Sequence, residues 1–410
     1  MTVTYQNRLD DLNKAFSLEL NDKVLVAPFS DHFFSTRRAG ISNKDAMRDH
    51  GARFQALKQT VLDFDLDLAL QSGIYPAQWF SALDAKHYQW PGGDLPDDKT
   101  FQFIEKEYLL ADEYDQFLAN PTDFTFRVLW PRMTGKLAPL GAFPPLFSLG
   151  PDPIFLGPAF SYPENLAVLK SLVELAKAAA ESDQAESAYV EEMKELGYPV
   201  SYQANFTPPF DIVADFLRGL KGTMLDMYRV PDRLLETTEK VIPYILRAAL
   251  AGAQLTGVPF VFMPMHKGLD GFMSLEQFKT FFWPSLRKVI LALIEEGLIP
   301  TVLWEGDCTS RLETIKNIPR GKAIYWFEKT DIFKAKEILG DTVCIRGNVP
   351  AAMLCVGSPA EVTDYCKKLV NVVGKGGGFI LDGGTGIPAE AKPENVKAMA
   401  DAIKDFGLYG

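Results

Sequence analysis

Leu298-Ile-Pro-Thr-Val-Leu-Trp-Glu-Gly-Asp-Cys-Thr-Ser310 is the stretch that decides the fold, because it changes abruptly from apolar to acidic residues. Thr301, Val302 and Leu303 are residue types that favour a buried strand. Glu305 and Asp307 follow at once, and residues 311–315 then begin an amphipathic helical pattern. A buried strand that ends in carboxylates and leads into a helix is typical of a parallel α/β barrel, whose strand ends carry the chemistry.

Glu305 and Asp307 allow two interpretations. In the structural one, Glu305 is a salt-bridge partner and Asp307 caps the following helix. In the functional one, both side chains point to the same side, because side chains of an extended chain repeat every two residues. Two close carboxylates resist joint ionisation, so such a pair either binds a cation or keeps one proton. We favour the functional interpretation and note that Gly306 is able to disturb the alternation.

The rest of the chain alternates short apolar strands with helical patterns. This alternation predicts βα units and a parallel sheet. Strands are expected near residues 24, 66, 199, 259, 300, 323, 342 and 378, and eight strands close a barrel. We therefore predict an α/β protein, a single (β/α)8 TIM barrel over residues 1–410, with a helical extension at its N-terminus.

Residues 73–160 interrupt the alternation and are irregular, aromatic and rich in Pro. We expect them to form an insertion over the C-terminal mouth of the barrel. Trp79, Tyr88 and Trp90 either line a pocket there or pack within the insertion, and packing is the more common role of such side chains. The many Pro and Gly residues of the segment 123–163 favour a covering loop over a helix.

The composition excludes several classes of function. The chain has 410 residues, of which 42 are basic and 53 acidic, for a formal net charge of −11. With no basic patch, nucleic acid and anionic membranes are unsuitable partners. No apolar run reaches the ~18 residues that span a bilayer, and the first residues lack the apolar region of a signal peptide. We expect a cytoplasmic protein whose four cysteines stay reduced.

Barrel geometry gathers the residues that follow each strand at one mouth. His266 is the preferred acid/base candidate, since it is one of only four histidines and follows a strand; the alternative is a loop histidine. Asp382 precedes Gly383 and Gly384, where the backbone can approach a ligand. The expected catalytic residues are Glu305, Asp307, His266 and Asp382, the expected substrate contacts are Asp211, Asn205, Trp304, Arg346 and Asn348, and Asp31, His32, Asp270 and Glu328 belong to the same mouth. Loop anchoring is the alternative for Arg346 and Asn348.

Several stretches resemble uroporphyrinogen decarboxylase and its relatives, which include corrinoid-dependent methyltransferases. The similarity extends from about residue 198 to 407. It rests on an ordered set of motifs: Phe206-Thr-Pro-Pro-Phe, the spacing of His266-Lys-Gly-Leu-Asp-Gly to Pro284, Gly347-Asn-Val-Pro, Asp382-Gly-Gly-Thr-Gly-Ile-Pro, and Lys392-Pro-Glu-Asn-Val-Lys-Ala-Met. The resemblance implies a barrel enzyme and favours the methyltransferase branch.

Departures from the family pattern narrow this expectation. The decarboxylases carry Met-Arg-Gln-Ala-Gly-Arg-Tyr, where this chain has Thr36-Arg-Arg-Ala-Gly-Ile-Ser42, and their closing histidine is Thr385 here. Uroporphyrinogen is therefore not the expected substrate. The methyltransferases bind zinc through His-x-Cys and a further Cys, and Glu305-Gly-Asp307 and Thr385 stand at those places. The resemblance still suggests zinc at Glu305, Asp307 and Cys308, because zinc accepts carboxylates and thiolates; a small buried hydrophobe is the usual role of a lone cysteine.

The first hypothesis is a methyltransferase that moves a methyl group between a small substrate or carrier, for example a methoxylated compound, and a separate corrinoid protein. A metal or acid cluster at the barrel mouth would activate the heteroatom that leaves. The alternatives are a decarboxylase or other lyase acting on a non-porphyrin substrate, and a binding protein without catalysis. Whether the chain forms a homodimer is left open.

Overall fold

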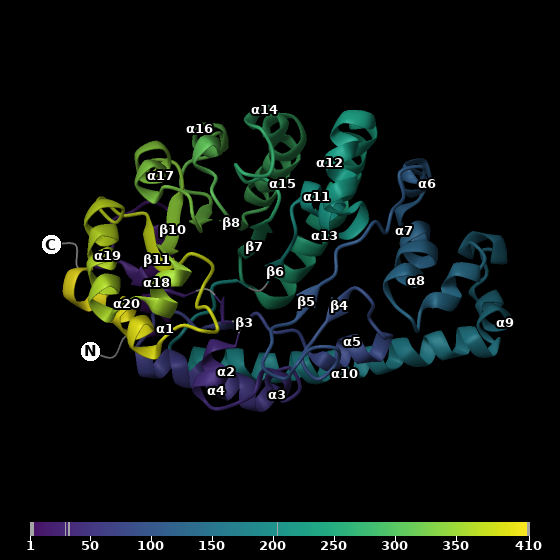
Figure 1. The fold of residues 1–410 in the computed structure, drawn as a ribbon, viewed down its shortest axis with the longest axis horizontal. Coiled ribbons are helices and arrows are strands. Elements are labelled where there is room, and N and C mark those ends of the chain that lie inside the picture. Colours follow the sequence, from purple (N-terminus) through teal and green to yellow (C-terminus); the bar gives the residue numbers. More distant parts are fainter. Residues whose placement is uncertain (1–3, 29, 32, 203, 408–410) are drawn as a thin grey trace.

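Parallel strands with helices around them form the main body of this computed structural model, on the left in Figure 1; the structure describes residues 4–28, 30–31, 33–202 and 204–407. Seven strands are hydrogen-bonded in the order β1-β11-β10-β9-β8-β7-β6. Their bounds are β1 Leu25–Val26, β6 Ala204–Asn205, β7 Phe260–Met265, β8 Ile299–Trp304, β9 Ile324–Phe327, β10 Cys344–Val349 and β11 Phe379–Gly383. The stretch that opens the sequence argument is thus the middle of the sheet.

Residues 67–72 supply the eighth segment and link the two ends of this sheet. The Asp67 N–H donates to the Val26 carbonyl at 3.0 Å, and the Ala69 N–H donates to the Pro199 carbonyl at 2.9 Å. Further along, β2 (Ser30–Asp31) pairs in parallel with β3 (Gln71–Ser72). These bonds complete the ring, and the α/β barrel expected from the sequence is confirmed.

Helices cover the outer face of the ring because most of them connect one strand to the next, while α1 precedes the first strand and α20 follows the last. The Ser274–Gln277 and Ser358–Glu361 capping boxes start two of them, as their spacing predicts. The barrel helices are α1 Tyr5–Phe16, α2 Phe34–Arg38, α3 Asn43–Ala46, α4 His50–Phe64, α11 Pro209–Asp211, η5 Ile212–Leu217, α12 Gly219–Arg229, α13 Pro231–Thr256, α14 Leu275–Gln277, η6 Phe278–Phe282, α15 Trp283–Glu295, η7 Thr309–Arg311, α16 Leu312–Ile315, α17 Ile332–Leu339, α18 Ala351–Val356, α19 Pro359–Val372 and α20 Pro393–Phe406.

Residues 73–160 lie between β3 and the long helix α10 (Pro163–Glu195), which runs along the barrel (Figure 1). They begin with α5 (Ala77–Leu83) and the antiparallel pair β4 (Tyr88–Gln89) and β5 (Gln102–Phe103). The second half is more helical than the covering loop that its Pro and Gly content suggested, because proline at the start of a short helix fits its backbone. It contains α6 Tyr114–Ala119, α7 Pro121–Phe124, η1 Thr125–Leu129, α8 Trp130–Met133, η2 Ala138–Ala142, η3 Leu146–Leu149, η4 Pro153–Phe155 and α9 Leu156–Phe160.

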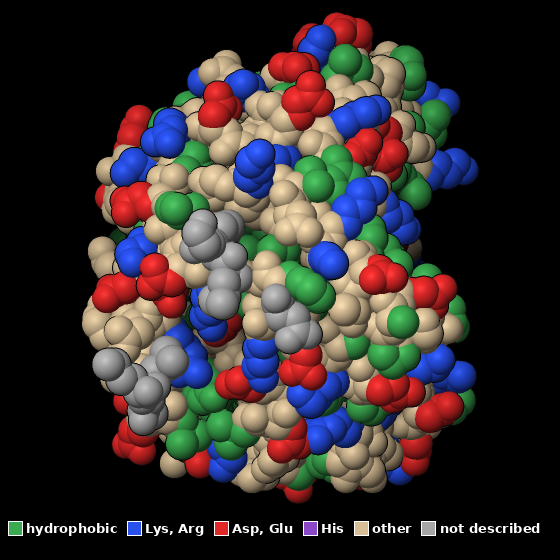
Figure 2. Space-filling model, turned by 90° about the vertical axis from the view of Figure 1, so that its left-hand side faces the viewer, with side chains coloured by type: hydrophobic (Ala, Val, Ile, Leu, Met, Phe, Trp, Pro, Cys, Tyr) green, Lys and Arg blue, Asp and Glu red, His purple; other side chains and the backbone are tan. Residues whose placement is uncertain are grey.

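The packing of the core follows from the alternation of side chains between the two faces of each strand. Leu303, Trp326 and Phe262 face the interior of the ring and pack together. Their neighbours Trp304 and Tyr325 face outward and join the larger core between sheet and helices. Lys and Arg side chains are interspersed with Asp and Glu on the face shown in Figure 2, without a continuous basic area. None of the helices in the described part of the chain combines the length and apolarity needed to span a bilayer.

Candidate active site

A cavity of about 570 Å³ lies where the strand ends meet the insertion. Strand ends and the residues after them contribute Asn205, Pro264, His266, Lys267, Leu303, Glu305 and Thr385, and η5 contributes Asp215 and Phe216. The insertion contributes Gly73, Ile74, Tyr75, Tyr88, Phe101, Phe103 and Glu105. The cavity is thus at the end of the barrel where chemistry was expected.

Aromatic rings form two walls of this cavity. On the barrel side, the Phe262 ring centroid lies 5.1 Å from that of Tyr202 and 6.2 Å from that of Trp326. On the insertion side, the Phe103 centroid lies 5.3 Å from those of Tyr88 and Phe216. Such spacing leaves ring faces and edges toward the cavity, which suits a flat apolar ligand.

The aromatic residues of the insertion divide between the two roles that the sequence left open. Tyr88 lines the cavity, together with Tyr75. Trp90 packs against Phe80, with ring centroids 5.1 Å apart, in the small core of the insertion. Sequence alone did not separate the two roles because both need the same large apolar side chains.

His266 is held at the acidic end of the cavity by three carboxylates. Its Nδ1–H donates to Asp215 at 2.6 Å, and its Nε2 lies 3.8 Å from Glu305 Oε1. Burial by itself lowers the pKa of His266, but the hydrogen bond to Asp215 and the charges of Asp211 and Glu305 outweigh it and raise this pKa to about 9. At neutral pH the imidazole therefore carries a proton on Nε2 beside the cavity.

Lys267 lies next to His266 and is paired on both sides. Its Nζ is 3.1 Å from Asp215 Oδ1 and 3.3 Å from Glu105 Oε2. Burial lowers the pKa of Lys267, but these two carboxylates outweigh it and the pKa is raised. Asp215 thus bridges the imidazole and the ammonium group, one with each oxygen, and fixes both at the cavity wall.

Glu305 and Asp307 do not share the site, which corrects the expectation from strand alternation. Gly306 has a φ of +75°, a left-handed conformation that breaks the two-residue repeat. Glu305 lines the cavity, and burial raises the pKa of its carboxyl. The Asp307 carboxylate instead accepts bonds from the N–H and hydroxyl of Thr309 at 2.9 and 2.6 Å. Asp307 therefore orders the turn after β8, close to the capping role of the structural interpretation.

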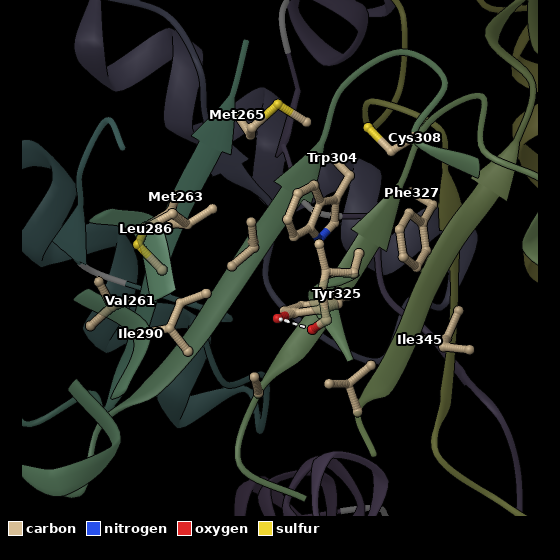
Figure 3. Packing of buried hydrophobic residues seen from close by; sticks show 14 of the residues in the cluster. Val261, Met263, Met265, Leu286, Ile290, Trp304, Cys308, Tyr325, Phe327 and Ile345 are labelled. Carbon is tan, nitrogen blue, oxygen red and sulfur yellow. Dashed lines mark hydrogen bonds between the residues drawn. The ribbon is translucent and has the colours of Figure 1, made fainter. Parts of the chain in front are cut away.

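Two residues that were predicted to contact the substrate stabilise the barrel instead. Trp304 is fully buried on the outer face of β8, near Tyr325 (Figure 3), and is not among the residues that line the cavity. Asp211, also fully buried, accepts the backbone N–H groups of His266 and Lys267 at 2.7 and 3.0 Å. Burial raises the pKa of Asp211. Asp211 therefore positions the loop that carries the imidazole, and Asn205 is the predicted contact that lines the cavity.

Arg346, Asp382 and Asn348 lie inside the barrel but hold its own parts together. The Arg346 Nε–H donates to Asp382 at 2.8 Å, and both residues are almost completely buried. The Asn348 side chain donates to the Thr330 carbonyl at 3.2 Å and accepts from the Tyr365 hydroxyl at 3.0 Å. Loop anchoring, the alternative for Arg346 and Asn348, describes the contact of Asn348 with Thr330, whereas Arg346 joins the neighbouring strands β10 and β11. His32 lies outside the described residues, as does the side chain of Asp31.

Comparisons with known proteins place the chain in a family. The model of the family described as "Uroporphyrinogen decarboxylase (URO-D)" matches residues 153–406, more than half of the chain. The chain belongs to the URO-D family. A uroporphyrinogen decarboxylase of Chlorobium phaeovibrioides is 28% identical over 138 residues, which are 32% of this chain and 38% of that protein. One of Methylococcus capsulatus is 32% identical over 192 residues, 46% of this chain and 52% of its own length. The match thus spans about half or less of these relatives.

A solved structure shares the fold of this chain over nearly the full length of both proteins. It is a methyltransferase from Methanosarcina mazei, with a TM-score of 0.63 and 15% identity, covering 98% of this chain and 99% of that one. At this identity the likeness establishes the fold, and function has to be argued from the site.

The URO-D site of this chain is poorly suited to a tetrapyrrole with many carboxylates. Arg37, the counterpart of a family arginine, is committed to Asn43, Glu390 and the Asp98 carbonyl instead of the cavity. Among the described lining residues the basic side chains are His266 and Lys267, against three carboxylates. An anionic substrate with several carboxylates would therefore meet repulsion here.

The zinc site that the resemblance suggested does not fit these residues. Within the described part of the chain, no three His, Cys, Asp or Glu side chains converge into a metal-binding group. Cys308 is buried, its sulfur faces the Glu305 carbonyl oxygen at 3.9 Å, and burial raises the pKa of the thiol. Asp307 points to Thr309. Glu305 therefore faces the cavity while Asp307 and Cys308 do not, so the three residues suggested for zinc do not converge.

Three charged residues of the site were not found from the sequence: Asp215, Lys267 and Glu105. Asp215 had a usable signal, since it lies four residues after Asp211 and so on the same helical face. Lys267 adjoins His266, but neighbours in sequence do not normally point to one site. Glu105 comes from the irregular insertion, for which no periodicity exists to place a side chain.

Proposed function

We propose that this URO-D family member is a methyltransferase that removes a methyl group from a small methoxylated aromatic compound and passes it to a corrinoid on a separate protein. The observation that carries the proposal is the convergence of a protonated His266 and a half-buried Glu305 at one end of an aromatic cavity. The cavity offers a proton at a place where a flat apolar ring can be held.

The proton on His266 would be transferred to the leaving group. An ether oxygen becomes a good leaving group when a positioned acid protonates it as the C–O bond to the methyl group breaks. The electron pair of that bond stays on the oxygen, which takes the proton from His266 Nε2 and leaves as a phenol. A reduced corrinoid supplies the nucleophile that accepts the methyl group. Asp215 stabilises the charged imidazole before the transfer, and Glu305 lies 3.8 Å from Nε2.

The aromatic walls would select the ring. Tyr75, Tyr88 and Phe103 on one side and Phe262 and Trp326 on the other present π faces and edges to the cavity. A bound arene gains stacking or edge contacts of about 0.5–1.5 kcal/mol per pair beyond the burial of its area. Small ligand pockets commonly combine apolar walls with a few polar groups in this way.

A carboxy-lyase acting on a non-porphyrin substrate is the second candidate. The same protonated His266 could protonate the carbanion that forms when carbon dioxide leaves, and the curated relatives named above are decarboxylases. The two functions differ in product, because a decarboxylase releases carbon dioxide from the substrate without any corrinoid.

The test compares Glu305→Gln and His266→Gln with Asp307→Asn as the matched control. Purified protein is mixed with 2-methoxyphenol and reduced free cobalamin, and the methylated corrinoid is followed by its absorbance. Removing a general acid costs about 10²–10⁴ in rate, so His266→Gln should lose at least about a hundredfold. Glu305→Gln removes a charge that helps to keep His266 protonated and should also lose activity, while Asp307→Asn stays within a few-fold. Equal losses in all three variants, or full activity in His266→Gln, would refute the assignment.

A further inference from the structure

Negative charge outweighs positive charge on the walls of the cavity. The carboxylates are Glu105, Asp215 and Glu305, and they face the imidazole of His266 and the ammonium group of Lys267. The described lining residues include no further Lys and no Arg. Since the whole chain also has a net charge of −11, its overall field attracts cations and repels anions.

Both cationic side chains of the cavity are already paired within the protein. Lys267 Nζ lies 3.1 Å from Asp215 and 3.3 Å from Glu105. His266 lies 2.6 Å from Asp215 and 3.8 Å from Glu305. A substrate carboxylate would be the third carboxylate around either cation, and the repulsion from the two that are present would offset its attraction.

Glu105, by contrast, has room for another donor. A carboxylate offers about four acceptor sites. One oxygen of Glu105 accepts the Leu220 N–H, and the other accepts from Lys267 at 3.3 Å. The side chain lines the cavity and is 29% exposed. An ammonium group on a ligand can therefore add a charge-assisted hydrogen bond to Glu105 without displacing either partner.

Aromatic rings lie on the same wall as this carboxylate. Phe101, Phe103 and Glu105, every second residue of the segment 101–105, line the cavity. Phe103 pairs with Tyr88 across β4 and β5, with ring centroids 5.3 Å apart, and the Tyr75 centroid lies 5.2 Å from that of Phe101. The faces of such rings attract a cation within about 6 Å of the centroid. A carboxylate beside several rings suits an organic ammonium group.

A continuous row of side chains connects Glu105 to the proposed acid. Glu105 contacts Lys267 at 3.3 Å, Lys267 contacts Asp215 at 3.1 Å, and Asp215 accepts from His266 at 2.6 Å. The row is short enough for one substituted ring to present one substituent to His266 and another to Glu105.

We propose that the substrate is a methoxylated arene whose side chain carries a cationic amine, with the methoxy oxygen at His266 and the ammonium group at Glu105. This inference rests on the proposed methyl transfer for the methoxyarene itself and adds the charge that the cavity selects. Glu105 is then the residue that determines specificity, with Tyr75, Tyr88 and Phe103 around the bound cation.

The test uses three compounds that share the 2-methoxyphenol unit and differ in charge. They are 4-hydroxy-3-methoxybenzylamine, 4-hydroxy-3-methoxybenzyl alcohol and 4-hydroxy-3-methoxybenzoate, which are cationic, neutral and anionic at pH 7. Isothermal titration calorimetry with the full native chain measures the three Kd values. We expect the amine to bind at least about tenfold more tightly than the alcohol, which is about 1.4 kcal/mol, and the benzoate to bind more weakly than the alcohol.

Glu105→Gln tests the residue, and Glu107→Gln is its matched control. Glu107 lies two residues further along, pairs with Arg218 at 3.2 Å and is not among the residues that line the cavity. Glu105→Gln should weaken binding of the amine and strengthen binding of the benzoate, because Lys267 loses one of its two carboxylate partners. Glu107→Gln should leave all three Kd values within a few-fold. A general loss of folding cannot produce two changes of opposite sign.

Several results would overturn the inference. These are equal Kd values for the amine and the alcohol, a benzoate that binds as tightly as the alcohol, no binding of any of the three at millimolar concentrations, and an unchanged preference in Glu105→Gln. Methyl transfer from each compound to reduced cobalamin is measured separately. Selective binding of the amine without transfer would refute the proposed function and leave this inference standing. Transfer from all three with equal kcat/KM would support the proposed function and refute this inference.

Discussion

Asp215→Asn should change the protonation of His266 more than any other single substitution in the cavity. The substitution keeps the size of the side chain and removes its charge. His266 then loses a charged acceptor 2.6 Å from Nδ1, while Asp211 and Glu305 remain. Lys267 loses one of its two carboxylate partners and keeps Glu105.

The size of the effect follows from this geometry. An opposite charge within about 4–6 Å changes a pKa by roughly 1–3. One third of the His266 side chain is exposed, so solvent screens part of the interaction and the lower half of that range applies. The pKa of His266 should therefore fall from about 9 to about 7–8. At pH 8 the native imidazole is then roughly nine-tenths protonated and the variant's about half or less, by ordinary titration.

Titration by ¹H–¹⁵N NMR measures this directly and needs no substrate. The chain has four histidines, and His266→Gln identifies the signal to follow. In the methyl-transfer assay with the methoxyarene, the pH at which turnover falls on the alkaline side should decrease by the same amount as the pKa of His266.

Asp270→Asn is the control for charge removal nearby. Asp270 accepts hydrogen bonds from the N–H and hydroxyl of Ser310 at 2.9 Å each. Because solvent and salt screen more distant charges, Asp270→Asn should change the pKa of His266 by no more than about 0.3. A native His266 that titrates at or below its ordinary value of about 6.5 would refute the site electrostatics. An unchanged titration in Asp215→Asn would do the same.

Three further outcomes follow from the buried groups. Because the pKa of folded His266 is raised to about 9, the stability that its protonation adds is fully present below about pH 6.5 and is lost as the pH rises to 9. The unfolding free energy measured with denaturant should therefore fall by about 1–2 kcal/mol across this window, after discounting for exposure. His266→Gln should remove this pH dependence. Arg346→Met removes the guanidinium group that donates to the buried Asp382 carboxylate and should lower the unfolding free energy by about 3–5 kcal/mol, whereas a loss below 1 kcal/mol would show the pair to be dispensable. Elemental analysis should find no stoichiometric zinc, and a Cys308→Ser variant that loses bound zinc would contradict the geometry described above.

The sequence by itself determined the barrel and the end at which its site lies. Short apolar strands such as 299–304 and 344–349 alternate with capped helices, and strand burial and the handedness of βα units leave few other arrangements. The two capping boxes and the placement of His266 and Glu305 after strands followed from the same local rules. These features depend on residues within a few positions of one another, which is why the sequence alone reveals them.

The tertiary structure decided which of the mouth residues meet. Gly306 turns Asp307 away from Glu305, and Arg346 and Asp382 satisfy each other inside the barrel. Asp215, Lys267 and the rings of Tyr88 and Phe103 reach the cavity from a π-helical turn, a loop and the insertion. The direction of each of these side chains depends on packing between segments far apart in the chain, and no local pattern in the sequence carries that information.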